Sequence, residues 1–362
     1  MDFDNLNNQS EGFEQEPSEQ ETENEDFNED YATNNQTFAV NPGIYYNPVL
    51  TREKNDIKKL ALASGISFIL VNLLTYVVGF ILYRIPVALG VSRDALTGFF
   101  TEPASLQIQQ IVLSILFFTL PFAIVFKLSG YRISSLISFA SPKKNMVLPM
   151  FLIGISVCAF ANIALSVAGN LFQQFGIDYN VNYGENPKGF FGFLLSFIAT
   201  AITPALVEEF ACRGIVLGAL RKYGDGFAII VSSILFGLMH GNFVQIPFAF
   251  LVGVICGYIV VKTGSIWIAV AVHAFNNSAS VILDYAFSQS SQVKNVIYLV
   301  FLIISLGLGI LALLLVKDIS AYTSIEKVKT ECDEKKKYVW FFTSIPIIAF
   351  IFISLIGSLK YF

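Results

Sequence analysis

The chain has 362 residues, of which 54% are hydrophobic and only 14% are charged, and its mean hydropathy is +0.63. Soluble domains carry roughly 25% charged residues, so this composition excludes a water-soluble globule. The net charge of −4 and the lack of Lys and Arg in residues 1–50 exclude a nucleic-acid-binding protein. We therefore expect a membrane protein, with the lipid bilayer and no nucleic acid among its partners.

The N-terminal region is acidic and polar. Residues 1–30 hold twelve Asp and Glu, no Lys or Arg, and many Asn, Gln and Ser. Such a segment buries too little apolar surface to offset the entropy that it would lose on ordering. The sequence predicts a disordered acidic tail on the cytoplasmic side over residues 1–55.

Eight apolar runs without Asp, Glu, Lys or Arg follow, and a membrane helix needs about 20 such residues. The fifth run is too long for one helix and is interrupted by His240-Gly241-Asn242, so we divide it into two. The predicted fold is all-α, a polytopic bundle of about nine transmembrane helices. The runs cover residues 60–83, 103–126, 145–177, 189–207, 226–261, 263–283, 295–316 and 338–359.

Basic residues predict the orientation in the membrane. When the connecting segments are assigned to alternating sides, eighteen of the 23 Lys and Arg residues fall on the side of the N-terminus. Because cytoplasmic loops are rich in these residues, we predict a multi-pass cell-membrane protein whose N-terminus is cytoplasmic and whose C-terminus is outside. Two N-terminal helices are expected in residues 56–135, a central core in residues 140–285, and two C-terminal helices with a basic cytoplasmic loop in residues 286–362.

The first polar cluster in the central core is Glu208-Glu209, followed by Arg213. Ionisable side chains are costly at bilayer depth, so they point to a function. Glu209 and Arg213 are four residues apart with the acid first, which is the favourable order for an ion pair on a helix. That pairing leaves Glu208 unpaired and able to exchange protons.

Two further clusters contain both histidines of the chain. His240 shares a helix face with Phe236, and His273 shares one with Asn277. A His and an Asn on one face can both donate to a single oxygen, which suits an oxyanion site. Asn276 points elsewhere, and we expect it to serve helix packing.

Together the clusters supply a hydrolytic set: a carboxylate that deprotonates water, a His partner, and a His–Asn donor pair. Glu208, His240 and His273 can instead hold Zn²⁺ with water in the open position, and both alternatives stay open. A non-catalytic scaffold or immunity protein that uses the same pocket is a further alternative. So is a proton-coupled transporter with the buried acid and histidines as its relay.

The three motifs resemble a known family. Glu-Glu-x-x-x-Arg at 208–213, Phe-x-x-x-His at 236–240 and His-x-x-x-Asn at 273–277 follow one another on successive apolar helices. This order and spacing resemble the CAAX-protease and bacteriocin-processing (CPBP, or Abi) family, which includes the type II CAAX prenyl proteases. The resemblance covers roughly residues 187–283. Cys212 departs from the aromatic or bulky residue that usually precedes the Arg.

The resemblance implies an intramembrane endopeptidase that cleaves a membrane-associated peptide or protein, with a role in bacteriocin processing or self-immunity. It implies that Glu208 activates water and that His240 assists. It also implies that His273 and Asn277 stabilise the oxyanion and that Glu209 and Arg213 support the site. These six residues are the catalytic candidates. The resemblance does not fix the metal dependence, so the protein is a metalloprotease only on the condition that Zn²⁺ is bound, with Glu208, His240 and His273 as its ligands.

Overall fold

The computed structural model describes residues 47–174, 186–287, 291–316 and 322–359, except 323 and 326. These residues form helices and connecting segments, with no strand among them, which confirms the all-α prediction. The helices are α2 (Pro48–Ala88), α3 (Arg93–Thr101), α4 (Pro103–Leu128), α5 (Ile133–Leu136), α6 (Lys144–Gln174), α7 (Gly189–Phe197), η1 (Ile198–Ile202), α8 (Thr203–Glu209), η2 (Phe210–Leu217), α9 (Gly218–Leu220), η3 (Arg221–Tyr223), α10 (Asp225–Leu238), α11 (Gln245–Thr263), α12 (Trp267–Ala286), α13 (Ser291–Leu315), α15 (Glu334–Phe342) and α16 (Ile345–Ser358).

The chain divides into two units, residues 1–51 and 52–362. Most of the predicted tail, residues 1–46, lies outside the described residues. Its last part does not match the prediction, because α2 already begins at Pro48. Proline suits the first turn of a helix, where its missing N–H would have no partner. The side chain of Asn47 caps this start by accepting a hydrogen bond from the backbone N–H of Leu50 at 3.0 Å.

The predicted count of nine spans is not confirmed. In the described ranges, six helices are long and apolar enough to cross a membrane, or seven if α15 and α16, bent by 69°, form one span. Helix α10 has 14 residues, about 21 Å at 1.5 Å per residue, which is shorter than the ~30 Å hydrocarbon core. Helix α12 is not among the six, and it carries His273, Asn276 and Asn277. Two of the three polar clusters therefore lie on helices that do not qualify as a simple span, whereas the first lies in Gly189–Tyr223, which does.

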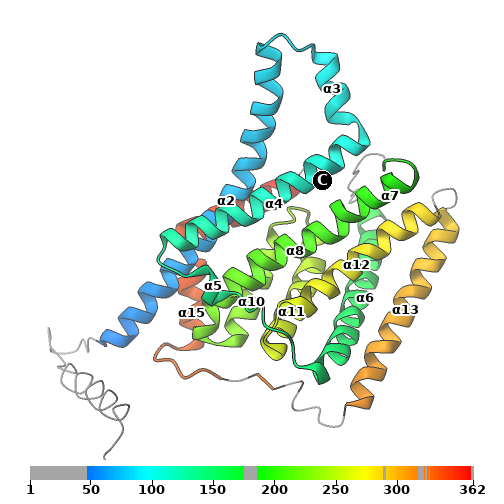
Figure 1. Cartoon of the computed structure of the whole chain (residues 1–362). Coiled ribbons are helices and arrows are strands. Elements are labelled where there is room, and N and C mark those ends of the chain that lie inside the picture. Colours follow the sequence, from blue (N-terminus) through cyan, green and yellow to red (C-terminus); the bar gives the residue numbers. More distant parts are fainter. Residues whose placement is uncertain are drawn as a thin grey trace, which may run out of the picture. The chain divides into compact units, whose positions relative to one another are not determined.

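A single long helical segment, Gly189–Tyr223, lies at the centre of the arrangement. It runs from α7 to η3, with α4 packed along one side and α12 along another (Figure 1). Helix α10 packs against η2 and α11, and α6 packs against α11, α12 and α13. This arrangement brings the three predicted polar clusters, which lie on α8–η2, α10 and α12, against one another.

The predicted interruption at His240-Gly241-Asn242 is confirmed, since α10 ends at Leu238 and α11 begins at Gln245. Gly241 has φ +56°, a left-handed conformation that glycine adopts without a steric penalty. The Asn242 side chain is 2% exposed and accepts from the backbone N–H of Val244 at 3.0 Å. The break thus reverses the chain direction and satisfies a backbone donor at the start of the next helix.

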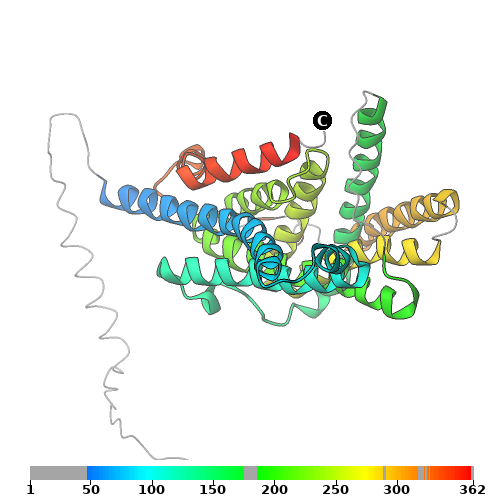
Figure 2. The same cartoon turned by 90° about the horizontal axis from the view of Figure 1, so that it is seen from above.

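Helix α16 lies beside α2 in Figure 2. The rings of Phe68 and Phe350 stack with centroids 4.8 Å apart.

Near the start of α2, Asp56 accepts hydrogen bonds from the hydroxyls of Tyr131 at 2.7 Å and Tyr223 at 2.6 Å, and pairs with Lys222. Burial, followed by the hydrogen bond to Asp56, raises the pKa of Tyr131, so this phenol stays protonated as a donor.

The contact between α9 and α5 gives a stability prediction. A Cβ at Gly218 would lie 2.2 Å from the carbonyl oxygen of Leu136, so Gly218→Ala forces two backbones apart. We expect a loss of about 1–3 kcal/mol in the free energy of unfolding. Gly226→Ala in α10 is the control, because its Cβ meets nothing within 4 Å and should be neutral or stabilising. Equal unfolding midpoints for the two variants in denaturant would show that α5 does not pack on α9.

Candidate active site

The first predicted cluster lies on the central helical segment. Glu209, the last residue of α8, and Arg213 in η2 form the predicted ion pair, with Oε1 3.2 Å from Nη1 and both side chains 0% exposed. By contrast, the side chain of Glu208 is 15% exposed. The buried pair is therefore structural in character, and Glu208 is the carboxylate of the two that a small molecule can reach.

The helix that carries Glu208 is irregular on both sides of it. The segments η1 and η2 are π-helical, and π-helical turns are frequently found at functional sites. Pro204 explains part of this, since it has no N–H to donate to the carbonyl of Thr200, four residues earlier. Two side chains use the carbonyls of this turn instead. Gln110 of α4 donates to the Ala199 carbonyl at 3.2 Å, and Asn277 of α12 donates to that of Thr200 at 3.2 Å.

The second cluster lies at the end of α10. His240 Nδ1 lies 2.8 Å from the carbonyl oxygen of Phe236. A carbonyl can only accept, so Nδ1 carries a proton and the lone pair of neutral His240 is on Nε2. The Phe236 ring lies edge-on to the His240 ring, with centroids 5.1 Å apart, and to the His273 ring, at 5.8 Å. Phe236 therefore separates the two imidazoles and fixes the position of each.

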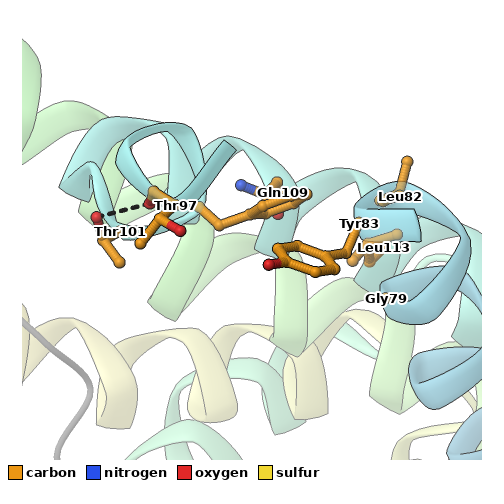
Figure 3. A pocket seen from close by; sticks show the side chains of 8 residues that line it. Gly79, Leu82, Tyr83, Thr97, Thr101, Gln109 and Leu113 are labelled. Atoms are coloured by element: carbon orange, nitrogen blue, oxygen red, sulfur yellow. Dashed lines mark hydrogen bonds between the residues drawn. The ribbon is translucent and has the colours of Figure 1, made fainter. Parts of the chain in front are cut away.

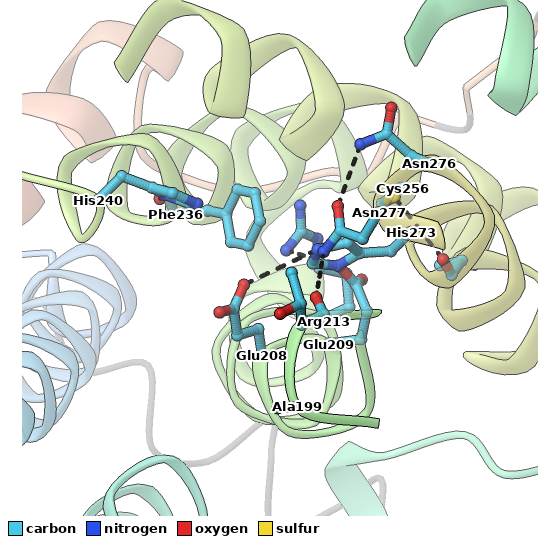
Figure 4. Close-up of polar contacts among 12 residues, drawn as sticks. Ala199, Glu208, Glu209, Arg213, Phe236, His240, Cys256, His273, Asn276 and Asn277 are labelled. Carbon is cyan, nitrogen blue, oxygen red and sulfur yellow. Dashed lines mark hydrogen bonds and ion pairs between the residues drawn. The ribbon is translucent and has the colours of Figure 1, made fainter. Parts of the chain in front are cut away.

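The third cluster, on α12, faces the first directly. His273 Nδ1 lies 3.0 Å from Oε1 of Glu209, and His273 Nε2 lies 3.9 Å from Oε2 of Glu208 (Figure 4). Asn277, one turn further along α12, reaches the same helical segment through Thr200. The imidazole is thus held between the two neighbouring carboxylates, hydrogen-bonded to the buried one and facing the exposed one.

The structure brings together five of the six predicted residues. Three lie in the segment Gly189–Tyr223, and two lie on α12 and make polar contacts with that segment. These residues are Glu208, Glu209, Arg213, His273 and Asn277. His240 joins them through the Phe236 ring alone, and the described residues contain no hydrogen bond or ion pair between His240 and Glu208. Glu208 is also not unpaired as predicted, because His273 faces it.

Asn276 serves helix packing as expected, since it bonds to α6, but it does not point away from Asn277. Its Nδ2 donates to Oδ1 of Asn277 at 3.1 Å, and its Oδ1 accepts from Asn162 of α6 at 2.8 Å. A residue assigned to packing is therefore hydrogen-bonded to a candidate oxyanion donor. Asn162 and Gln110 were not predicted at all. Their only signal in the sequence is an amide inside an apolar run, which is not specific enough to identify a partner helix.

The electrostatics of the buried pair are unusual. In the described part of the chain, the three guanidinium nitrogens of Arg213 and Oε2 of Glu209 have no hydrogen-bond partner. Arg213 instead places its Cζ 4.1 Å from the centroid of the Phe236 ring, which supplies a cation–π contact. Glu209 is thus held by charge on one side and by the His273 hydrogen bond on the other.

The conditional zinc set is not assembled. The described ranges contain no group of three or more His, Cys, Asp or Glu side chains placed to hold a metal ion. The Nδ1 atoms of His240 and His273 bond to the Phe236 carbonyl at 2.8 Å and to Glu209 at 3.0 Å, which leaves Nε2 of each ring for another partner. The two imidazoles and Glu208 are nevertheless not gathered around one point that a metal ion could occupy.

A separate hollow lies away from these residues, between the second half of α2, α3 and α4 (Figure 3). Its lining is mainly apolar and includes Tyr83, Thr97 and Gln109. Among its described lining residues there is no Asp, Glu, His, Lys or Arg. Apart from the phenol of Tyr83, it therefore offers no group for acid–base chemistry, and the candidate active site stays with the three clusters.

Comparison with known proteins finds a family that is similar to part of the chain. Residues 190–279 match the family model described as Type II CAAX prenyl endopeptidase Rce1-like, which confirms the resemblance to the CAAX-protease family. A protein of Bacillus subtilis (strain 168) named "Putative membrane peptidase YdiL" is 29% identical over 115 residues. That match covers 30% of this chain and 47% of the relative, so the chain spans about half of the relative's length. No solved structure matches. Asn162 and Gln110 lie outside the matched family segment.

Proposed function

From the family to which residues 190–279 belong, type II CAAX prenyl endopeptidases, we propose that this multi-pass membrane protein is an intramembrane endopeptidase. It hydrolyses a peptide bond in a membrane-associated peptide or protein. The observation that carries the proposal is that His273 of α12 faces Glu208, and that Asn277, one turn further along α12, bonds to Thr200 of the same helical segment. A partly exposed acid and two potential N–H donors at one place are the parts that amide hydrolysis requires.

The charges of the cluster balance when His273 is an imidazolium. Glu209 then neutralises Arg213, and Glu208 neutralises His273. A buried cluster without net charge avoids the large cost of an unpaired ion in a medium of low dielectric constant. In this state both nitrogens of His273 carry protons. Nδ1 donates to Glu209, and Nε2–H is available to an oxygen that becomes negative.

The gap between Glu208 and His273 suits a water molecule. A separation of 3.9 Å between Oε2 and Nε2 is too long for a direct hydrogen bond, but one water can bond to both atoms at about 2.8 Å. The carboxylate of Glu208 removes a proton from this water as its oxygen attacks the scissile carbonyl. The new oxyanion accepts from His273 Nε2–H and Asn277 Nδ2–H. The C–N bond then breaks, and the proton on Glu208 passes to the leaving nitrogen.

His240 supplies a second proton acceptor, since its Nε2 lone pair is free while Nδ1 donates to Phe236. Its role as the assistant of the attacking water rests on the Phe-x-x-x-His motif and on its place against the Phe236 ring. The scaffold and transporter alternatives have no observation of their own in their favour.

The proposal is tested with purified protein in proteoliposomes, supplied with membrane-anchored peptides of varied sequence, and with new termini identified by mass spectrometry. We expect cleavage products that require Glu208. Absence of any Glu208-dependent product overturns the proposal. A cellular phenotype that survives Glu208→Gln would favour the scaffold, and proton-coupled flux without cleavage would favour the transporter.

His240→Asn gives a prediction that separates chemistry from folding. The Asn amide can still donate to the Phe236 carbonyl, but it has no basic nitrogen. We expect kcat/KM to fall by at least about 100-fold while the melting temperature stays close to that of the wild type. Wild-type turnover in this variant would remove His240 from the mechanism.

A further inference from the structure

A chain of three asparagine side chains connects α6, α12 and η1. Asn162 Nδ2 donates to the carbonyl of Cys158 at 2.9 Å and to Oδ1 of Asn276 at 2.8 Å. Asn276 Nδ2 donates to Oδ1 of Asn277 at 3.1 Å. Asn277 Nδ2 then donates to the carbonyl of Thr200 at 3.2 Å. Each amide is therefore hydrogen-bonded to the next, and both ends of the chain are backbone carbonyls.

The two ends fix the direction of the whole chain. A carbonyl has lone pairs and no proton, so Asn162 must present Nδ2 to Cys158, and Asn277 must present Nδ2 to Thr200. With Nδ2 of Asn162 also against Asn276, the atom of Asn276 that meets it must be an oxygen. Asn276 then presents its Nδ2 to the oxygen of Asn277. Turning over any one amide would place two donors or two acceptors against each other.

The direction of the chain decides what Asn277 can do. Its Oδ1 is occupied by Asn276, and one N–H is occupied by Thr200. The second N–H of Asn277 remains for another acceptor, because an amide carries two donors. If Asn277 turned over, its oxygen would face Thr200, and the position of its free donor would change. An acceptor oxygen cannot stabilise a developing negative charge.

The local sequence explains why the Thr200 carbonyl can accept a hydrogen bond from a side chain. Pro204 has no N–H to donate to it, so the carbonyl is available to a side chain from α12. The neighbouring carbonyl of Ala199 also accepts a hydrogen bond from a side chain, that of Gln110 of α4. The π-helical turn η1 is therefore held from both sides, and Asn277 bonds to a fixed point.

We propose that Asn162 and Asn276 are positioning residues that orient the Asn277 amide as an oxyanion donor. This inference rests on the proposed function and deepens it. It adds two residues to the site, one of which, Asn162, lies outside the family segment 190–279. Neither residue touches the reacting atoms, so each acts only through Asn277.

The test uses the proteoliposome cleavage assay with Asn276→Ala, Asn276→Leu and Asn162→Leu. We expect kcat to fall by roughly 10- to 100-fold in each, with KM unchanged, because the donor acts on the transition state and not on the bound substrate. The smaller and the larger replacement at 276 should behave alike, since both lack the amide. Asn72→Leu is the matched control, because Asn72 Nδ2 donates to the Phe68 carbonyl at 3.0 Å as Asn162 does to Cys158.

A background that lacks Asn277 separates positioning from packing. If Asn276 acts through Asn277, then Asn276→Leu added to Asn277→Ala changes kcat by less than about two-fold. A full additional loss in that background, or full activity in the three single variants, overturns the inference. The melting temperatures of all variants are measured as well. If an Asn276 variant shows no cooperative thermal unfolding, Asn162→Leu takes its place in the comparison.

The two proposals can fail separately. If the wild type shows Glu208-dependent cleavage and the Asn variants keep its kcat, this inference alone is overturned. Absence of wild-type cleavage would overturn both proposals.

Discussion

Glu208→Gln is expected to lower the rate of peptide cleavage by about 100- to 10,000-fold, the range that a general acid–base catalyst contributes. The amide has the shape of the carboxylate, but it cannot take a proton from water. The free energy of unfolding should change by less than about 1 kcal/mol. Glu208 is partly exposed, and its distance of 3.9 Å from His273 is too long for a direct hydrogen bond, so little stability depends on this pair. Cleavage kinetics and thermal melting of the same preparation measure both effects.

The control for this variant is Glu102→Gln. Glu102 caps α4, where its carboxylate accepts from the backbone N–H of Ser105 at 2.6 Å, and it takes no part in the proposed chemistry. An amide oxygen can still accept this hydrogen bond, so both activity and stability should stay near wild type. Cleavage at the wild-type rate by Glu208→Gln would remove the water-activating carboxylate from the mechanism.

Glu209→Gln is expected to have the opposite signature, with a loss of about 3–5 kcal/mol in the free energy of unfolding. Glu209 and Arg213 are both fully buried and pair at 3.2 Å. Removing one charge leaves the other without compensation in an apolar interior, which is the most costly outcome for a buried pair. Activity should fall as well, because a neutral amide oxygen is a weaker acceptor than the carboxylate for the His273 N–H that it orients at 3.0 Å. Denaturant unfolding in detergent measures the stability term.

The double variant Glu209→Gln/Arg213→Met tests the cause. Removing both charges should recover part of the stability, since no unpaired ion remains. The pair Arg221–Asp225 is the matched control, with the same four-residue spacing but an Arg221 side chain that is 38% exposed. Arg221→Met should cost no more than about 1 kcal/mol. A loss equal to that of Glu209→Gln would contradict burial as the cause.

Local features of the site could be predicted from the sequence. The Glu209–Arg213 pair and the turn at His240-Gly241-Asn242 were predicted and are present. Both depend on residues a few positions apart, whose relative placement is set by helix geometry or by glycine. The count of spans was less secure, because hydropathy does not register that α10 is only 14 residues long or that α15 and α16 bend by 69°.

Contacts between helices could not be predicted in the same way. The sequence placed Asn276 away from the site, whereas it bonds to Asn277 and Asn162. It also assigned His240 to assist the water that Glu208 activates, whereas His273 is the imidazole that faces this acid. The π-helical turns around Glu208 change the direction in which side chains leave the helix, and regular helical spacing does not anticipate them.

Composition, apolar run lengths and four-residue spacing by themselves determined that the chain is a helical membrane protein with three polar clusters in its core. They do so because burial in lipid and helix periodicity act on residues that are near in sequence. Only the tertiary structure decided which imidazole faces which carboxylate and which amides orient Asn277. Those contacts depend on the crossing and register of helices separated by up to 114 positions in the chain, and packing in an apolar medium selects them through shape and hydrogen bonding together.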